Sequence, residues 1–137
     1  MKILGIGSEV VECLRVARMI ERHGEQFINR VFTPGEVRYC NSRKLATQHF
    51  AGRWAAKEAV MKALGVRGRK GFNWRDIEIR PDRETGRNKV GARGAARDVL
   101  EQAGVGDIFV SIAHCRSVAT AHAVVVARRR KRPDPEV

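Results

Sequence analysis

The chain has 137 residues and a formal net charge of +12, with 43% hydrophobic and 31% charged residues. This composition is typical of one soluble globular domain and excludes an intrinsically disordered chain. No apolar run is long enough to span a bilayer, and the N-terminus lacks the features of a signal peptide. The widely spaced Cys13, Cys40 and Cys115 form neither a disulfide framework nor a zinc motif. They favour a location in the reducing cytoplasm.

The basic charge predicts an anionic partner. Most of it lies on residues 1–127, which we expect to form the folded domain. Residues 128–137 begin with RRRKR and show no apolar periodicity, so we expect a disordered basic tail. Nucleic acid, phosphorylated cofactors, anionic membranes and acidic proteins all remain open as partners.

The first third of the chain predicts one strand followed by three helices. Residues 2–7 read as a buried strand that glycines end. Residues 12–23 have a broad apolar side and a separate row of arginines, which is typical of a helix. A short helical segment is expected around 27–31. Thr33 and Glu36 then form a capping box that begins another short helix.

The rest of the chain predicts one long helix, a strand pair, a shorter helix and a second strand pair. The longest signal is the helix 46–64, which Gly65 ends. This order indicates an α+β fold, with a mostly antiparallel sheet packed against a long central helix. The later elements are expected at 76–80 and 88–92 for the first strand pair, 92–103 for the helix, and 108–113 and 119–127 for the second strand pair.

Three acidic or basic side chains are candidates for chemistry. Glu9 follows a glycine-rich strand end and can reach into a cleft, although it could simply open the next helix, where the helix dipole favours an acid. Glu58 and Lys62 lie four residues apart, so they share a face of the longest helix. The carboxylate could bind a metal or act as a base, and the lysine could hold a phosphate. The alternative is an exposed ion pair worth about 0.3–0.5 kcal/mol.

Two further places could bind phosphate. Ser111 and His114 lie at the end of a late strand, but three residues along a strand need not share a face, which disfavours a catalytic dyad. The loop 65–71 is basic and rich in glycine. It is not a Walker A loop, because no GK[ST] follows. It could cradle phosphates through its backbone, or it could be a flexible basic loop.

These segments together resemble a known family. GIGSEVVECLRV near the N-terminus and FAGRWAAKEAVMKALG at 50–65 are similar to the two signatures of the holo-[acyl-carrier-protein] synthases, a class of 4′-phosphopantetheinyl transferases. DIEIRPDRETGRNKV and VSIAHCRSVATAHAVV resemble the family's middle and late strands. The order and spacing agree from residue 1 to about 127, and the RRRKR tail lies outside the resemblance.

The resemblance implies an α+β fold and a homotrimer with each active site between two subunits. It implies Mg²⁺-dependent transfer of the phosphopantetheine arm of coenzyme A to a serine of an acidic apo-acyl carrier protein, as in fatty acid biosynthesis. The products are the holo-carrier protein and 3′,5′-ADP. Either Glu58 or a metal-bound water could accept the serine proton.

The resemblance also assigns roles to individual residues. Glu9 and Glu58 match the Mg²⁺ ligands, and Lys62 matches a lysine near the coenzyme A phosphates, which makes Glu58 and Lys62 the expected catalytic pair. Further matched positions line the coenzyme A site: Arg53, Gly65, Ser111 and His114. The region that contacts the carrier protein contains Arg15, Met19, Arg22 and Phe27.

Four positions depart from the family pattern. Glu9 stands for the usual aspartate, Arg67 interrupts a GTG sequence, Asn88 replaces a proline and Ala113 replaces a serine or threonine. Two other functions stay open, one because of the basic charge and tail and the other because of Glu9. One is a basic nucleic-acid-binding domain, although we find no motif or aromatic platform for it. The other is a homologue that binds coenzyme A but transfers poorly.

Overall fold

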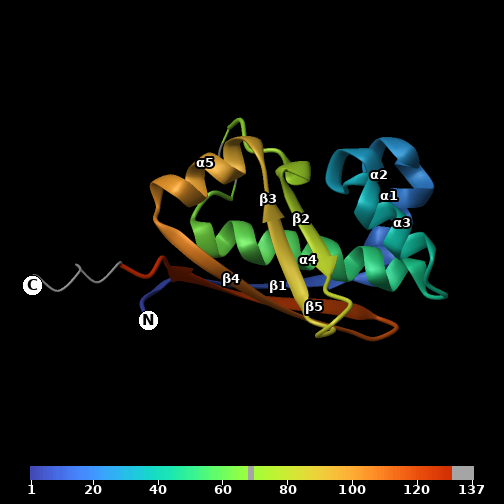
Figure 1. Ribbon diagram of the computed structural model, residues 1–137. Helices are drawn as coiled ribbons and strands as arrows, with labels where there is room; N and C mark the ends of the chain where they lie inside the picture. Colours follow the sequence, from blue (N-terminus) through green and yellow to red (C-terminus); the bar gives the residue numbers. More distant parts are fainter. Residues whose placement is uncertain (68–69, 131–137) are drawn as a thin grey trace, which may run out of the picture.

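The computed structural model describes residues 1–67 and 70–130 (Figure 1). Residues 68 and 69 of the expected basic loop and residues 131–137 of the expected tail lie outside the described part. The elements follow the order strand, helices, strand pair, helix, strand pair. They are β1 (Ile3–Glu12), α1 (Cys13–His23), α2 (Glu25–Val31), α3 (Pro34–Asn41), α4 (Ala46–Leu64), the 3₁₀ turn η1 (Trp74–Asp76), β2 (Ile77–Pro81), β3 (Asn88–Ala92), α5 (Gly94–Gln102), β4 (Val105–His114) and β5 (Val118–Ala127).

The strands form one antiparallel sheet in the order β1-β5-β4-β3-β2. Helix α4 packs along one face of this sheet, mainly against β1 and β5 and partly against β4. Helices α1, α2 and α3 gather around one end of α4, and α5 lies near the other (Figure 1). The expected α+β fold with a central helix on an antiparallel sheet is confirmed.

Strand β1 is longer than expected. It continues past Gly7 to Glu12 because its backbone pairs with β5 along its whole length, as far as Glu12 opposite Val118. The glycines do not end the strand; they allow α4 to approach it. A Cβ atom at Gly7 would lie 1.9 Å from the Ala59 carbonyl oxygen, and one at Gly5 would lie as close to Ala63. Glu9 therefore belongs to the strand and does not open α1.

The chain around α4 is tied together by a buried ion pair. Lys57 is fully buried and lies 2.6 Å from Oε1 of Glu36. Its ammonium also donates to the carbonyl oxygens of Val31 and Trp74, and Glu36 accepts a bond from the Ile79 amide. A buried charge needs such partners. This network fixes α2, α3, η1 and β2 against the one helix that carries Glu58 and Lys62.

Several predicted boundaries hold and others shift by a few residues. Thr33 and Glu36 form the expected capping box, and Gly65 ends α4 in the left-handed conformation. Helix α5 is shorter than expected, because residues 92 and 93 leave β3 in an extended conformation. Strand β4 begins at Val105, three residues early, because that end still pairs with Ala127.

The face of the sheet that points away from α4 carries exposed apolar side chains. Residues alternate between the two faces of a strand. On β1, the odd-numbered residues such as Gly7 and Glu9 face α4. The even-numbered Ile6 and Val10 point to the opposite side and are 70% and 61% exposed. Phe109 on β4 is 54% exposed. Large apolar side chains exposed on one face of a sheet favour a surface that another molecule covers.

Candidate active site

Glu9, Glu58 and Lys62 meet where β1 crosses the second half of α4. Nζ of Lys62 lies 2.9 Å from Oε2 of Glu9 and also donates to the Ser8 carbonyl oxygen at 3.0 Å. The carboxyl groups of Glu9 and Glu58 lie close enough to alter each other's pKa. Lys62 thus pairs with Glu9 on the neighbouring strand, and not with Glu58 in the exposed ion pair that was the alternative from the sequence.

The two carboxyl groups shift each other's pKa in opposite directions. Burial, the hydrogen bond from Glu9 and the charge of Glu9 raise the pKa of Glu58 to about 7. Burial opposes ionisation of Glu9 as well, but the hydrogen bonds from Glu58 and Lys62 hold the pKa of Glu9 below its ordinary value. Two carboxyl groups in one site behave in this way because they cannot both ionise without a cation between them.

The arrangement fits a divalent ion. Oε2 of Glu9 is buried and has no hydrogen-bond donor in good geometry, although Lys62 and Arg67 lie near it as ion-pair partners. Mg²⁺ prefers one or two carboxylates and completes its shell with water and phosphate oxygens. Within residues 1–67 and 70–130, His, Cys, Asp and Glu do not gather in threes around a possible metal position. Further oxygen ligands would therefore have to come from water or a bound phosphate.

The C-terminal end of α4 places a glycine without a side chain, and then an arginine, near Glu9, Glu58 and Lys62. Gly65 has φ of +71°, and no heavy atom of the described residues lies within 4 Å of the position its Cβ would take. Two residues on, the exposed guanidinium of Arg67 lies 3.7 Å from Oε2 of Glu9. Arg67 departs from the family pattern, yet it extends the positive charge beside the carboxyl pair.

A second group of predicted residues lies at the other half of α4. Arg53 is buried, with 4% exposure, and its guanidinium stacks on the Tyr39 ring at 4.0 Å. One turn earlier, the His49 ring meets the His114 ring edge to face at 4.8 Å. Nδ1 of His114 is hydrogen-bonded to Oε1 of Gln48 at 2.9 Å. Sequence reasoning assigned no role to Gln48, His49 or Tyr39, because their types carry no motif.

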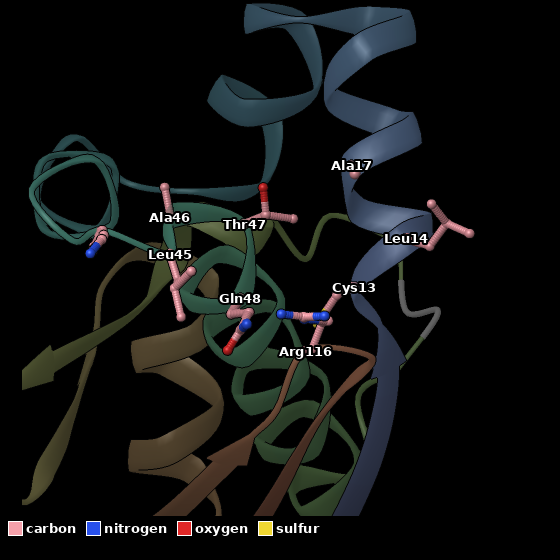
Figure 2. Close-up of a pocket in the computed structure, with 9 residues that line it drawn as sticks. Cys13, Leu14, Ala17, Leu45, Ala46, Thr47, Gln48 and Arg116 are labelled. Carbon is pink, nitrogen blue, oxygen red and sulfur yellow. The ribbon is translucent and has the colours of Figure 1, made fainter.

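A pocket of about 500 Å³ opens beside this second group (Figure 2). Figure 2 shows its walls: side chains of α1 on one side, the start of α4 on the other, and Arg116 from the β4–β5 hairpin below. Lys44, Arg116 and Gln48 supply its polar surface. Two cations at the wall of a partly apolar pocket can hold an anionic group that carries an apolar ring.

Ser111 does not join either group within one copy of the chain. His114 and Ile112 face α4, where both lie near Gly52. Ser111 has the opposite parity on β4 and is exposed on the open face of the sheet. There it lies opposite His122, whose Nδ1 is 3.0 Å from the Ser8 hydroxyl. The predicted coenzyme A residues therefore occupy separate places on one subunit.

The comparisons with known proteins agree on one family. The 4′-phosphopantetheinyl transferase superfamily matches residues 5–114. The holo-[acyl-carrier-protein] synthase of Rhodopirellula baltica is 45% identical over 125 residues, which cover 91% of this chain and 98% of the relative. The chain belongs to the 4′-phosphopantetheinyl transferase superfamily. Within it, the chain is a member of the holo-[acyl-carrier-protein] synthase family that its sequence resembles.

Solved structures of this synthase family share the fold. The crystal structure of the Neisseria meningitidis synthase is 29% identical, covers 90% of this chain and 98% of that one, and superposes with a TM-score of 0.83. A synthase–coenzyme A complex from Chronobacterium ammoniagenes is 32% identical, with a TM-score of 0.77, and covers 94% and 100% of the two chains. The family model spans Glu9, Arg53, Glu58, Lys62 and His114, which all lie within residues 5–114.

The predicted carrier-binding region of this synthase family member is a basic face of α1. Arg15, Arg18, Met19 and Arg22 line a shallow hollow of about 250 Å³ there. Phe27 does not reach this surface: it is 6% exposed and packs edge-on against Phe32 and Trp54. It supports the region from inside and offers no contact of its own.

Proposed function

We propose that this chain transfers the 4′-phosphopantetheine group of coenzyme A to a serine of apo-acyl carrier protein, giving holo-acyl carrier protein and 3′,5′-ADP. One observation carries the proposal: Glu9 and Glu58 form a carboxyl pair directly beside Lys62, in a chain with the fold of this transferase family. Nucleic-acid binding, the alternative from charge alone, lacks any comparable structural support.

Glu9 and Glu58 would hold the Mg²⁺ ion. Bound there, the ion supplies positive charge that binds the diphosphate and stabilises the charge that develops during transfer. Lys62 would contact the phosphate oxygens, which its flexible stem and 32% exposed side chain allow.

The transfer exchanges one phosphorus–oxygen bond for another. The serine oxygen of the carrier attacks the phosphorus that bears the pantetheine arm, and the bond to the bridging oxygen of the diphosphate breaks. The electron pair leaves with 3′,5′-ADP, where Lys62 offsets the charge on the departing phosphate. The serine gives up its proton during the attack. The Glu58 carboxylate is one group at the site that can accept this proton.

We place each active site between two subunits of a homotrimer. Arg53 and Lys62 lie nine residues apart on α4, about 14 Å along its axis, so one chain does not close a single pocket around both groups. The exposed Ile6, Val10 and Phe109 offer an apolar surface for a neighbouring copy. The same open face carries Ser111, which a neighbour would bring to a site.

The basic face of α1 is the proposed docking surface for the carrier protein. Acyl carrier proteins are acidic, and the three arginines Arg15, Arg18 and Arg22 lie along one side of the helix. Complementary charge speeds encounter and orients the partner more than it adds affinity. The face begins directly after β1, the strand that carries Glu9, so a docked carrier lies near the carboxyl pair.

We propose that the reaction takes place in the cytoplasm. All three cysteines are free, and two of them are buried thiols. Within the described ranges, none of the helices is both long and apolar enough to cross a bilayer.

Mass spectrometry tests the proposed function. We expect the full chain, incubated with coenzyme A, Mg²⁺ and apo-acyl carrier protein, to add the phosphopantetheine mass to the carrier. Glu58→Ala should abolish this gain, because the variant loses both a metal ligand and a proton acceptor. Glu101→Ala is the matched control, since Glu101 is an exposed acid on α5 that forms a surface ion pair with Arg97.

Two results would contradict the proposal. A wild-type chain that leaves the carrier unmodified while it binds coenzyme A would be a non-transferring homologue. A Glu58→Ala variant with full activity would remove the carboxyl pair from the chemistry.

A further inference from the structure

Arg53 and Lys57 are buried cations one turn apart on α4, and their surroundings differ. Lys57 has the Glu36 carboxylate at 2.6 Å and donates to two carbonyl oxygens. Arg53 is 4% exposed and forms no ion pair with any residue that the structure describes. Its Nε is buried without a hydrogen-bond partner among those residues. A buried charge is costly unless it is paired, so Arg53 is matched to a partner from outside the described chain.

The ring of Tyr39 carries this guanidinium. The central carbon of the Arg53 guanidinium lies 4.0 Å from the centre of the ring, and that of Arg43 lies 5.3 Å from the same centre. A guanidinium is planar, so its face can stack on an aromatic ring while its N–H groups point outward along its edge. The stack therefore fixes the plane of Arg53 without using its hydrogen-bond donors, and the unpartnered Nε lies on the edge that remains.

Tyr39 is itself held in a fixed position. It lies on α3, whose first turn is fixed by the capping box of Thr33 and Glu36. The Glu36 carboxylate in turn binds Lys57 of α4. From α4 the His49 ring also meets the Tyr39 ring edge to face at 5.7 Å. Contacts from both helices thus make Tyr39 a rigid support for the arginine.

The charges around Tyr39 attract an anion. Burial lowers the pKa of His49, and neighbouring positive charges, among them Arg53 and Arg43, lower it further. Lys44 and Arg116 add two more cations at the wall of the adjoining pocket of about 500 Å³. The carboxyl pair of the candidate active site needs a metal ion before it can hold a phosphate. This second group offers cations directly, so a phosphate can bind to it without a metal.

We propose that Tyr39 is a positioning residue of the coenzyme A site: its ring holds the Arg53 guanidinium ready to bind the 3′-phosphate, and so sets the preference for coenzyme A over dephospho-coenzyme A. The ligand rests on the proposed function, whereas the stack of Arg53 on Tyr39 does not. Coenzyme A carries a diphosphate, which the metal ion and Lys62 would hold, and a separate 3′-phosphate. The 3′-phosphate is therefore the group left for a site built from cations alone. Without the ring, Arg53 would gain other rotamers, and binding would have to order the side chain.

Proton NMR of the full chain, without any ligand, measures the stack directly. A hydrogen held over the face of an aromatic ring resonates upfield of its ordinary position because of the ring current. We expect the Nε–H of Arg53, assigned through Arg53→Lys, to be shifted upfield in the wild type. Tyr39→Phe keeps the ring and should keep the shift, whereas Tyr39→Leu should remove it. An ordinary Arg53 resonance in the wild-type chain, or one that Tyr39→Leu leaves in place, overturns the proposal.

Calorimetry without metal tests the consequence for binding. It compares 3′,5′-ADP with 5′-AMP, which lacks the 3′-phosphate. We expect Tyr39→Leu to weaken the binding of 3′,5′-ADP about tenfold and to leave that of 5′-AMP nearly unchanged. Tyr39→Phe should bind both as the wild type does. In the transfer assay, Tyr39→Leu should raise KM for coenzyme A with kcat unchanged, and should leave KM for dephospho-coenzyme A as it was. A residue with only a structural role would weaken both nucleotides alike.

A second variant keeps the test sharp if Tyr39→Leu folds poorly. Arg53→Lys leaves Tyr39 in place and keeps the positive charge, but an ammonium group has no flat face to stack. We expect it to lose the preference for the 3′-phosphate as Tyr39→Leu does. Full preference in Arg53→Lys would show that charge alone suffices and would overturn the role of the stack.

The two measurements separate the inference from the proposed function. A wild-type chain that binds neither 3′,5′-ADP nor coenzyme A refutes the proposed function, and NMR still decides whether Tyr39 holds Arg53. A Tyr39→Leu variant that keeps the full preference for 3′,5′-ADP over 5′-AMP, or loses affinity for both equally, refutes the role of Tyr39 alone.

Discussion

The carboxyl group of Glu9 is the point where the proposed catalytic side chains meet. Lys62 and Arg67 approach its Oε2 atom, and its charge helps to raise the pKa of Glu58. Glutamate reaches one methylene further from β1 than the aspartate usual in this family. That extra length lets a strand residue touch both a helix carboxylate and a helix lysine. The substitution is therefore compatible with a metal-binding pair.

Substitution of Glu9 should change the Mg²⁺ requirement. Glu9→Gln keeps the volume but removes the charge, so we expect the Mg²⁺ concentration for half-maximal transfer to rise on the order of tenfold. Glu9→Asp keeps the charge and should stay close to the wild type. The measurement is a Mg²⁺ titration of the transfer rate, with Glu101→Gln on α5 as the control. An unchanged Mg²⁺ dependence in Glu9→Gln would exclude Glu9 as a ligand.

At the level of residues, the sequence predicted which side chains matter better than what they touch. The spacing of Glu58 and Lys62 predicted both residues. Lys62 nevertheless forms its ion pair with Glu9, because β1 brings the Glu9 carboxylate closer to Lys62 than the Glu58 carboxylate is. Lys57 showed no sign of burial, since only the fold supplies Glu36 as its partner. Gln48 carries no charge and no motif, so its bond to His114 becomes visible only when α4 and β4 are in contact.

Strand β1 and helix α4 contact each other through main-chain atoms, without side chains between them. Gly5 and Gly7 leave room for the carbonyl groups of Ala63 and Ala59, which a methyl group would otherwise strike. The close approach places Glu9 within reach of α4. The glycines predicted a strand end from sequence, because glycine usually weakens a strand. In the structure these glycines mark the close approach of two backbones. The sequence alone does not distinguish this approach from a strand end, because glycine is found in both places.

A methyl group at Gly7 should be severely destabilising. We expect Gly7→Ala to lower the free energy of unfolding by about 3–5 kcal/mol, because the added Cβ would stand 1.9 Å from a backbone oxygen that cannot move alone. Denaturant unfolding measures the change. Gly52→Ala is the matched control: its Cβ meets only side-chain atoms at 3.0 Å or more, and alanine favours the helix. Equal stability of the two variants would contradict the close approach.

At the level of elements, periodicity predicted the helices, and both strand pairs were found. The long helix and the hairpin of β4 and β5 have strong local patterns, so their positions were predicted to within a few residues. The strand order could not be predicted from pattern alone. The position of β5 between β1 and β4 depends on long-range pairing, such as Glu9 opposite Ala121.

Within one subunit, the proposed site residues form two groups that lie at different positions along α4. Glu58 and Lys62 lie with Glu9 at one end, and Arg53 lies with His114 at the other. A homotrimer with sites between subunits would join one end from each of two copies. In that arrangement every copy of α4 serves two different active sites.

Mixing two inactive variants tests this arrangement. Glu58→Ala lacks one end and His114→Ala lacks the other, so each alone should be inactive or strongly impaired. In trimers assembled from equal amounts of both, about one quarter of the sites should receive an intact end from each neighbour. We expect transfer activity to return to about that fraction of the wild type. Sites contained within one subunit would give no recovery.

The position of α4 also has a genetic consequence. A subunit that carries both Glu58→Ala and His114→Ala would damage the site on each side of it, and a trimer with one such subunit would keep a single working site out of three. Co-expression of that double variant should therefore act as a dominant inhibitor of the normal protein, with a loss greater than its share of the subunits.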